Sequence, residues 1–142
     1  MQEIEVERRI GASPARVWSI LSDHEGMRSW MPVREVVRRR PGAPDPNGVG
    51  AVRTIRGMGL VIEERITEFE PPARLVYELT EGAPIRDHRG EVTLAPEDGG
   101  TRVRWRVRFR PAVPGTGGLL AFVLRRGLAG GLERLARLVE GA

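Results

Sequence analysis

In three consecutive strand-like segments, four polar residues stand at alternate positions that otherwise hold apolar residues. Glu64 occupies an alternate position in a series that otherwise holds leucine and isoleucine, and Tyr77 stands two residues from a leucine on each side. Arg86 and His88 occupy the same alternate positions as the valine and leucine that follow them. Alternate residues of a strand face the same side, so the four side chains would meet in one volume if consecutive segments pair. A buried charge needs a partner or a polar ligand group, whereas Arg86 and His88 could also lie solvated at the sheet rim.

An acid–base reaction is the catalytic chemistry that these side chains could support. His88, Arg86 and Tyr77 are the candidates, because an imidazole titrates near neutral pH and can shuttle protons. The sequence contains no cysteine and only two histidines, and it has no glycine-rich phosphate loop and no Ser-His-Asp elbow. We therefore predict no metal site and no cofactor, and we assign no catalytic residue beyond these candidates.

Proline and glycine divide the chain into short elements that would position these residues. The apolar periodicity predicts strands at 2–10, 33–40, 50–57, 59–69, 73–81, 85–95 and 101–110. Ser13-Pro14 starts one short helix, Asp23 could cap a second that runs to Trp30, and a long helix follows at 119–140. Connections this short leave no room for parallel crossovers, so the strands should form an antiparallel meander.

An arginine ladder follows the outer face of the last predicted strand. Its arginines alternate with the apolar series Val103, Trp105, Val107 and Phe109, and all 23 basic residues of the chain are arginine. The ladder resembles a phosphate-binding stripe, but the net charge is only +4 and the first strand offers a matching row of glutamates. We expect cross-strand ion pairs and no nucleic-acid partner.

The long C-terminal helix carries one apolar stripe that should face the sheet. Glycine inside a helix costs about 1 kcal/mol relative to alanine, so Gly127 and Gly131 on this stripe need a compensating role. They either leave room for a ligand or allow close packing. Leu119 and Phe122 fall toward the polar side and predict an exposed apolar patch. Arginine and glutamate interrupt the helix, which excludes a membrane span.

Three phrases carry a resemblance to a known superfamily. IGASPARVWSILSD, ERITEFEPPARLVYEL and GEVTLAPEDGGTRVRWRVRF, together with the order of elements, resemble the START-like polyketide cyclase/dehydrase and lipid-transport (SRPBCC) superfamily. The resemblance covers the whole chain as one domain, 1–142. It implies an α+β helix-grip fold, in which a seven-stranded curved antiparallel sheet, with two short helices after strand 1, and a long C-terminal helix enclose a cavity. It brings no shared catalytic motif.

In that fold the cavity would be lined by polar candidates, aromatic residues and one face of the helix. Trp30 could close its far end, while Trp105 and Phe109 would line the wall or simply pack in the core. The expected ligand-binding set is Trp30, Glu64, Tyr77, Arg86, His88, Trp105, Phe109, Leu120, Leu124 and Gly127.

Three functions are compatible with this resemblance. The first is binding, transport or sequestration of a small hydrophobic molecule such as a lipid, a polyketide or an aromatic metabolite. The second is a polyketide aromatase/cyclase that uses the acid–base candidates, and the third is a protein-interaction or co-chaperone-like module that uses Phe122 and the loop at 41–48. The acidic, alternating N-terminus does not resemble a signal peptide and the absence of cysteine fits a reducing compartment, so we expect a cytoplasmic protein. We expect it to be a monomer or homodimer.

Overall fold

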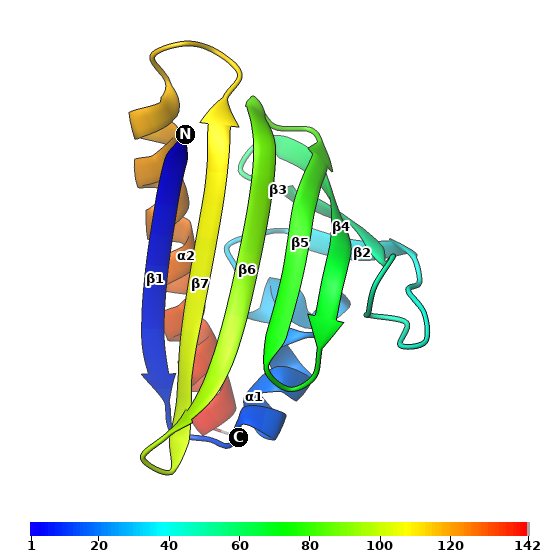
Figure 1. Ribbon diagram of the computed structural model, residues 1–142, viewed down its shortest axis with the longest axis vertical. Helices are drawn as coiled ribbons and strands as arrows, with labels where there is room; N and C mark the ends of the chain where they lie inside the picture. Colours follow the sequence, from blue (N-terminus) through cyan, green and yellow to red (C-terminus); the bar gives the residue numbers. More distant parts are fainter. Residues whose placement is uncertain (142) are drawn as a thin grey trace.

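The seven strands pair as one antiparallel sheet that curves around a long C-terminal helix (Figure 1). The structure is a computed structural model and describes residues 1–141. Its strand order is β1-β7-β6-β5-β4-β3-β2, which confirms the predicted meander. The strands are β1 (Gln2–Ile10), β2 (Glu35–Arg40), β3 (Val52–Gly57), β4 (Leu60–Glu70), β5 (Arg74–Glu81), β6 (Ile85–Glu97) and β7 (Gly100–Pro111).

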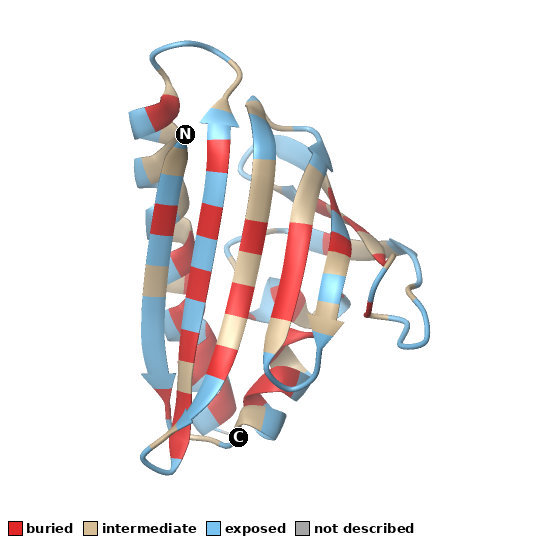
Figure 2. Cartoon of the chain, in the orientation of Figure 1, coloured by how far each residue is buried: buried red, intermediate tan, exposed pale blue. Residues whose placement is uncertain are grey.

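The alternation of β7 produces one buried and one charged face. Buried and exposed residues follow one another along this strand (Figure 2), and its apolar side chains belong to the central core. On the outer face Arg104 Nε lies 2.9 Å from a carboxylate oxygen of Glu5 and 3.0 Å from one of Glu7 on the paired strand β1. Arg104, together with Arg106 at 4.0 Å from Glu5, therefore forms the expected cross-strand ion pairs in the middle of the ladder.

Two short helical segments separate β1 from β2. The first, α1 (Pro14–Leu21), begins as predicted, because the Ser13 hydroxyl accepts a hydrogen bond from the backbone N–H of Arg16 at 3.3 Å. The second is a 3₁₀ helix, η1 (Glu25–Ser29), shorter than the predicted helix. Asp23 accepts a hydrogen bond from the Gly26 N–H at 3.3 Å, and Pro32 leaves space for little more than one turn.

The helix α2 (Gly117–Glu140) lies along the concave face, and its two halves differ in burial. Its C-terminal half buries Leu128, Leu132, Leu135 and Val139 in the core. Its N-terminal half exposes 67% of Leu119 and 57% of Phe122, which confirms the predicted apolar patch. None of the helices within 1–141 is both long and apolar enough to cross a membrane.

Candidate functional site

A cavity of about 410 Å³ separates the N-terminal half of α2 from the concave face of the sheet. Most of its lining is aliphatic, aromatic or methionine, contributed by η1, β3 to β7 and α2. This volume falls within the range of about 300–1,000 Å³ that small-molecule sites occupy. The predicted residues that line it are Glu64, Tyr77, His88, Trp105, Phe109, Leu120, Leu124 and Gly127.

The cavity opens where apolar side chains reach solvent at one end of the molecule. Met58 and Leu60 at the β3–β4 turn and Val123 on α2 line the cavity, yet they expose 68%, 46% and 42% of their surface. Leu119 and Phe122 add further exposed apolar surface on the same half of α2. These residues form an apolar rim around the entrance, which we call the mouth.

A buried ion pair forms part of the cavity wall. Arg53 on β3 donates from Nε to Glu64 Oε1 on β4 at 2.9 Å, and its Nη2 lies 2.7 Å from the same oxygen. Both residues line the cavity, and both are buried. Pairing at this geometry offsets the free-energy cost of burying two charges, so the pair adds a polar patch with no net charge to an otherwise apolar surface.

The ion pair continues into a hydrogen-bond chain that leads away from the cavity. Arg53 Nη1 lies 3.1 Å from Nδ1 of His24, and Nε2 of His24 lies 2.8 Å from the backbone carbonyl oxygen of Asn47. Because Arg53 donates, His24 must be neutral with its proton on Nε2. Burial, and then the charge of Arg53, lower the pKa of His24 to about 3, so it stays neutral at physiological pH.

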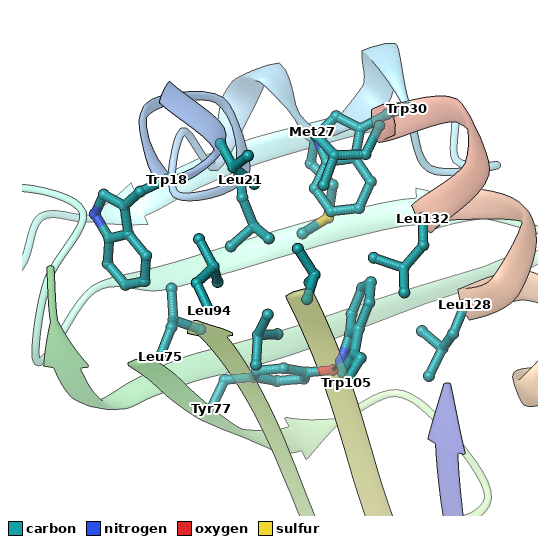
Figure 3. Packing of buried hydrophobic residues seen from close by; sticks show 14 of the residues in the cluster. Trp18, Leu21, Met27, Trp30, Leu75, Tyr77, Leu94, Trp105, Leu128 and Leu132 are labelled. Atoms are coloured by element: carbon teal, nitrogen blue, oxygen red, sulfur yellow. Dashed lines mark hydrogen bonds between the residues drawn. The ribbon is translucent and has the colours of Figure 1, made fainter. Parts of the chain in front are cut away.

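Tyr77 lies at the centre of the polar wall. Its hydroxyl accepts a hydrogen bond from Trp105 Nε1 at 2.9 Å (Figure 3), and the Arg53 guanidinium carbon lies 5.0 Å from the centre of its ring. Burial raises the pKa of the Tyr77 hydroxyl above its ordinary value. The phenol therefore keeps its proton at physiological pH and remains a potential hydrogen-bond donor.

His88 packs beside Tyr77, with 5.4 Å between their ring centres. Its Nδ1 accepts a hydrogen bond from the backbone N–H of Leu79 at 2.9 Å. Burial lowers the pKa of His88 below its ordinary value, which favours the neutral ring. In that ring the remaining proton lies on Nε2, so His88 adds a second N–H or O–H donor to the polar wall.

Two glycines shape the cavity in different ways. A Cβ atom at Gly90 would lie 2.2 Å from the Tyr77 ring, so only glycine on β6 lets that ring lie against the strand. A Cβ atom at Gly127 would meet nothing within 4 Å, and Gly127 lines the cavity. The missing side chain of Gly127 thus leaves open volume. A Cβ at Gly131 would instead approach Met31 Sδ at 2.3 Å, so Gly131 allows close packing.

Arg86 does not join the other polar candidates, and that part of the prediction is wrong. The β6–β7 register shifts between Arg86 and Arg89, and Asp87 adopts a positive φ of 52° there. This extra residue reverses the alternation, so Ile85 lines the cavity and Arg86 is exposed. Asp87 pairs with Arg110 on β7 at 3.3 Å, which holds the bulge on the outer face.

Trp30 lies behind the cavity wall and does not close its far end. Only 1% of Trp30 is exposed, and it is absent from the cavity lining. Its ring centre is 6.0 Å from that of Trp105, and Figure 3 shows it beside Met27. Trp30 therefore supports Trp105 from the core side.

Sequence reasoning did not identify Arg53 or His24 as members of the site. Arg53 shares the phase of the buried Ala51 and Ile55, so the alternation argument used for Glu64 could have found it. His24 lies between two short helices, where no periodicity indicates burial. Within residues 1–141, no three His, Cys, Asp or Glu side chains gather closely enough to hold a metal ion.

Comparison with known proteins supports this fold. A protein from Thermobifida fusca is 30% identical, with a TM-score of 0.82 over 98% of this chain and 93% of the other. XoxI from Bacillus cereus is 18% identical, with a TM-score of 0.81 over 98% and 96%. The Aha1 dimer from Colwellia psychrerythraea is 19% identical, with a TM-score of 0.74 over 99% and 97%. The similarities to XoxI and to the Aha1 dimer, both below 25% identity, show a shared fold alone.

Sequence comparison gives two further results. No curated protein matches the chain. The family model described as polyketide cyclase / dehydrase and lipid transport matches residues 1–140. Together with the curved sheet, the long C-terminal helix and the cavity between them, this match shows that the chain belongs to the polyketide cyclase/dehydrase and lipid transport family.

Proposed function

We propose that the protein binds a small, largely apolar molecule, such as a lipid, a polyketide or an aromatic metabolite, in the cavity beneath α2. The observation that carries this proposal is an apolar-lined volume of about 410 Å³ with an apolar mouth. Removing apolar ligand surface from water contributes roughly 25 cal/mol per Å², which is the driving force for such binding.

Filling the open space at Gly127 tests this function directly. In Gly127→Leu the new side chain enters the cavity, while in the control Gly130→Leu it lies outside the lining, where a Cβ would meet only the Arg134 guanidinium at 3.7 Å. The probe is N-phenyl-1-naphthylamine, a neutral dye whose fluorescence rises in apolar surroundings. We expect Gly127→Leu to weaken dye binding about ten-fold or more, which corresponds to about 1.4 kcal/mol.

The control separates cavity filling from general effects of leucine on the helix. Gly130→Leu should bind the dye within about two-fold of the unmodified protein, because its side chain takes no cavity volume. Equal binding by both variants and the unmodified protein would contradict the proposal. Native mass spectrometry of protein purified from its own organism then identifies the natural ligand, which is expected to be a small organic molecule.

The aromatase/cyclase hypothesis has less support from the wall geometry. A general base needs a free lone pair toward the substrate, but Nδ1 of His88 already accepts the Leu79 N–H. The raised pKa of Tyr77 also opposes loss of its proton. The test is turnover of a poly-β-ketone by variants in which His88 and Tyr77 are replaced. A fall of at least a hundred-fold would favour the enzyme over the binding protein.

The remaining predictions concern the whole protein. We propose a cytoplasmic monomer or homodimer in which the mouth admits the ligand, and light scattering coupled to size-exclusion chromatography measures the oligomeric state. If a stoichiometric protein partner and no small molecule accompany the purified chain, the mouth instead serves as the interaction surface around Phe122.

A further inference from the structure

The polar wall of the cavity contains a carboxylate oxygen that no protein group satisfies. The hydrogen bond from Arg53 Nε and the close contact of its Nη2 both reach Oε1 of Glu64. No donor to Oε2 exists among residues 1–141, and this oxygen is not sealed in the protein interior. The Glu64 side chain is only 8% exposed and lines the cavity. Oε2 therefore presents a strong hydrogen-bond acceptor to the cavity volume.

Two donors lie on the same wall. The Tyr77 hydroxyl uses a lone pair to accept from Trp105, which leaves its own hydrogen without an acceptor among the described residues. The proton of His88 on Nε2 is in the same situation, because Nδ1 accepts the Leu79 N–H. Leu79 also pairs with Glu64 across the β4–β5 ladder, so the carboxylate and the imidazole lie on adjacent positions of the wall.

The charges of the wall disfavour an anionic ligand. The charge of Arg53 is neutralised by Glu64, because Nε donates to Oε1 and Nη2 lies 2.7 Å from the same oxygen, while Nη1 donates to His24. A carboxylate or phosphate in the cavity would face Oε2 of Glu64, and among residues 1–141 the arginine that lines the cavity is already paired with Glu64. The wall instead requires a neutral group that both donates and accepts a hydrogen bond.

A hydroxyl group has this combination, with one donor and two acceptor lone pairs. We propose that the molecule bound in the cavity is a neutral alcohol or phenol whose hydroxyl group donates to Oε2 of Glu64 and accepts from Tyr77 or His88. This inference rests on the proposed function and specifies the chemical class of its ligand. The apolar remainder of the molecule lies against the aliphatic and aromatic lining between the polar wall and the mouth.

Three probes with the same two-ring body test the proposal: 2-naphthol, naphthalene and 2-naphthoate. Each is measured by displacement of N-phenyl-1-naphthylamine from the cavity. A hydrogen bond to a charged group is worth about ten-fold or more in affinity. We therefore expect 2-naphthol to bind about ten-fold or more tightly than naphthalene, and 2-naphthoate to bind more weakly than 2-naphthol.

Two variants locate the preference at the polar wall. In Glu64→Gln the amide oxygen can still accept from Arg53, but an NH₂ donor replaces the free acceptor, so the preference for 2-naphthol over naphthalene should disappear. Glu63→Gln, on the opposite face of β4, is the matched control and should keep it. If Glu64→Gln does not fold, Tyr77→Phe provides the second variant, and its preference should fall about three-fold or more.

The outcomes separate this inference from the proposed function. Equal affinity for 2-naphthol and naphthalene, tightest binding of 2-naphthoate, or an unchanged preference in the folded wall variants would overturn the hydroxyl assignment while dye binding persists. Absence of dye binding by the unmodified protein would instead count against the cavity as a ligand site.

Discussion

The two halves of α2 have similar apolar content but different surroundings. In the C-terminal half Leu128, Leu132 and Leu135 are buried in the core, and Met31 occupies the space above Gly131. Before Gly127 the helix faces the cavity on one side and exposes Phe122 on the other. The C-terminal half thus anchors the helix to the sheet, whereas the N-terminal half covers a void. Burial in this helix depends on the opposing surface and not on its own hydrophobicity.

Truncating a leucine in each half should give the largest difference. Leu135 is fully buried, so Leu135→Ala removes packed atoms and leaves a new cavity at a cost of about 3 kcal/mol. Leu124 is half-buried and already faces open volume, so Leu124→Ala should cost about 1 kcal/mol or less. Urea denaturation monitored by circular dichroism measures both values. Similar losses for the two variants would show that the N-terminal half is anchored as firmly as the C-terminal half.

The stability of the folded protein should also be sensitive to acid through His24. His24 is fully buried, and its pKa is lowered from 6.5 to about 3, so the unfolded state binds a proton more readily. Its contribution to stability is complete above pH 6.5 and is lost as the pH falls toward 3. Between about pH 8 and about pH 5 the free energy of unfolding should fall by about 2 kcal/mol from this residue.

Replacing each histidine in turn assigns the pH effect. Glu68, Glu97 and Glu133 have a pKa lowered from 4.5 by their arginine partners, so the stability that they lose on protonation falls mostly below this window. His24→Gln should therefore flatten the pH dependence, whereas His88→Gln at the cavity wall should change it less. A slope that survives in both variants would refute the assignment to His24.

The glycines of α2 should give the smallest effects, of opposite direction in the two halves. Gly127→Ala adds a Cβ that meets nothing, so it should stabilise the protein by up to about 1 kcal/mol through helix propensity. In Gly131→Ala the Cβ would approach Met31 Sδ at 2.3 Å, which removes that gain or reverses it. Thermal denaturation compares the variants, and equal stabilisation by both would contradict the packing difference.

Local alternation predicted much of the fold and part of the site. Glu64, Tyr77 and His88 line one cavity as their phase indicated, since β4, β5 and β6 are neighbours in the sheet. Arg86 faces the side opposite to the one that its alternation predicts, because Asp87 forms a bulge in β6. No glycine or proline marks this bulge in the sequence. Alternation holds only while the ladder register is continuous.

Residues outside regular elements, and contacts between distant elements, were beyond sequence reasoning. His24 is buried because the loop that contains Asn47 folds over it, a long-range contact that no spacing encodes. The two possible roles of Gly127 and Gly131 were equivalent in the sequence, and only the position of Met31 on a different segment distinguishes them. Side-chain partners across the cavity therefore required the structure.

The position of Trp105 gives the protein an internal optical reporter. Its indole lines the cavity and donates to Tyr77, so an occupant that enters changes both its polarity and its hydrogen bonding. The ring centre of Trp30 lies 6.0 Å from that of Trp105, while Trp18 packs against Phe69 at a separate location. Emission from the native chain can thus follow cavity filling in real time without any attached label.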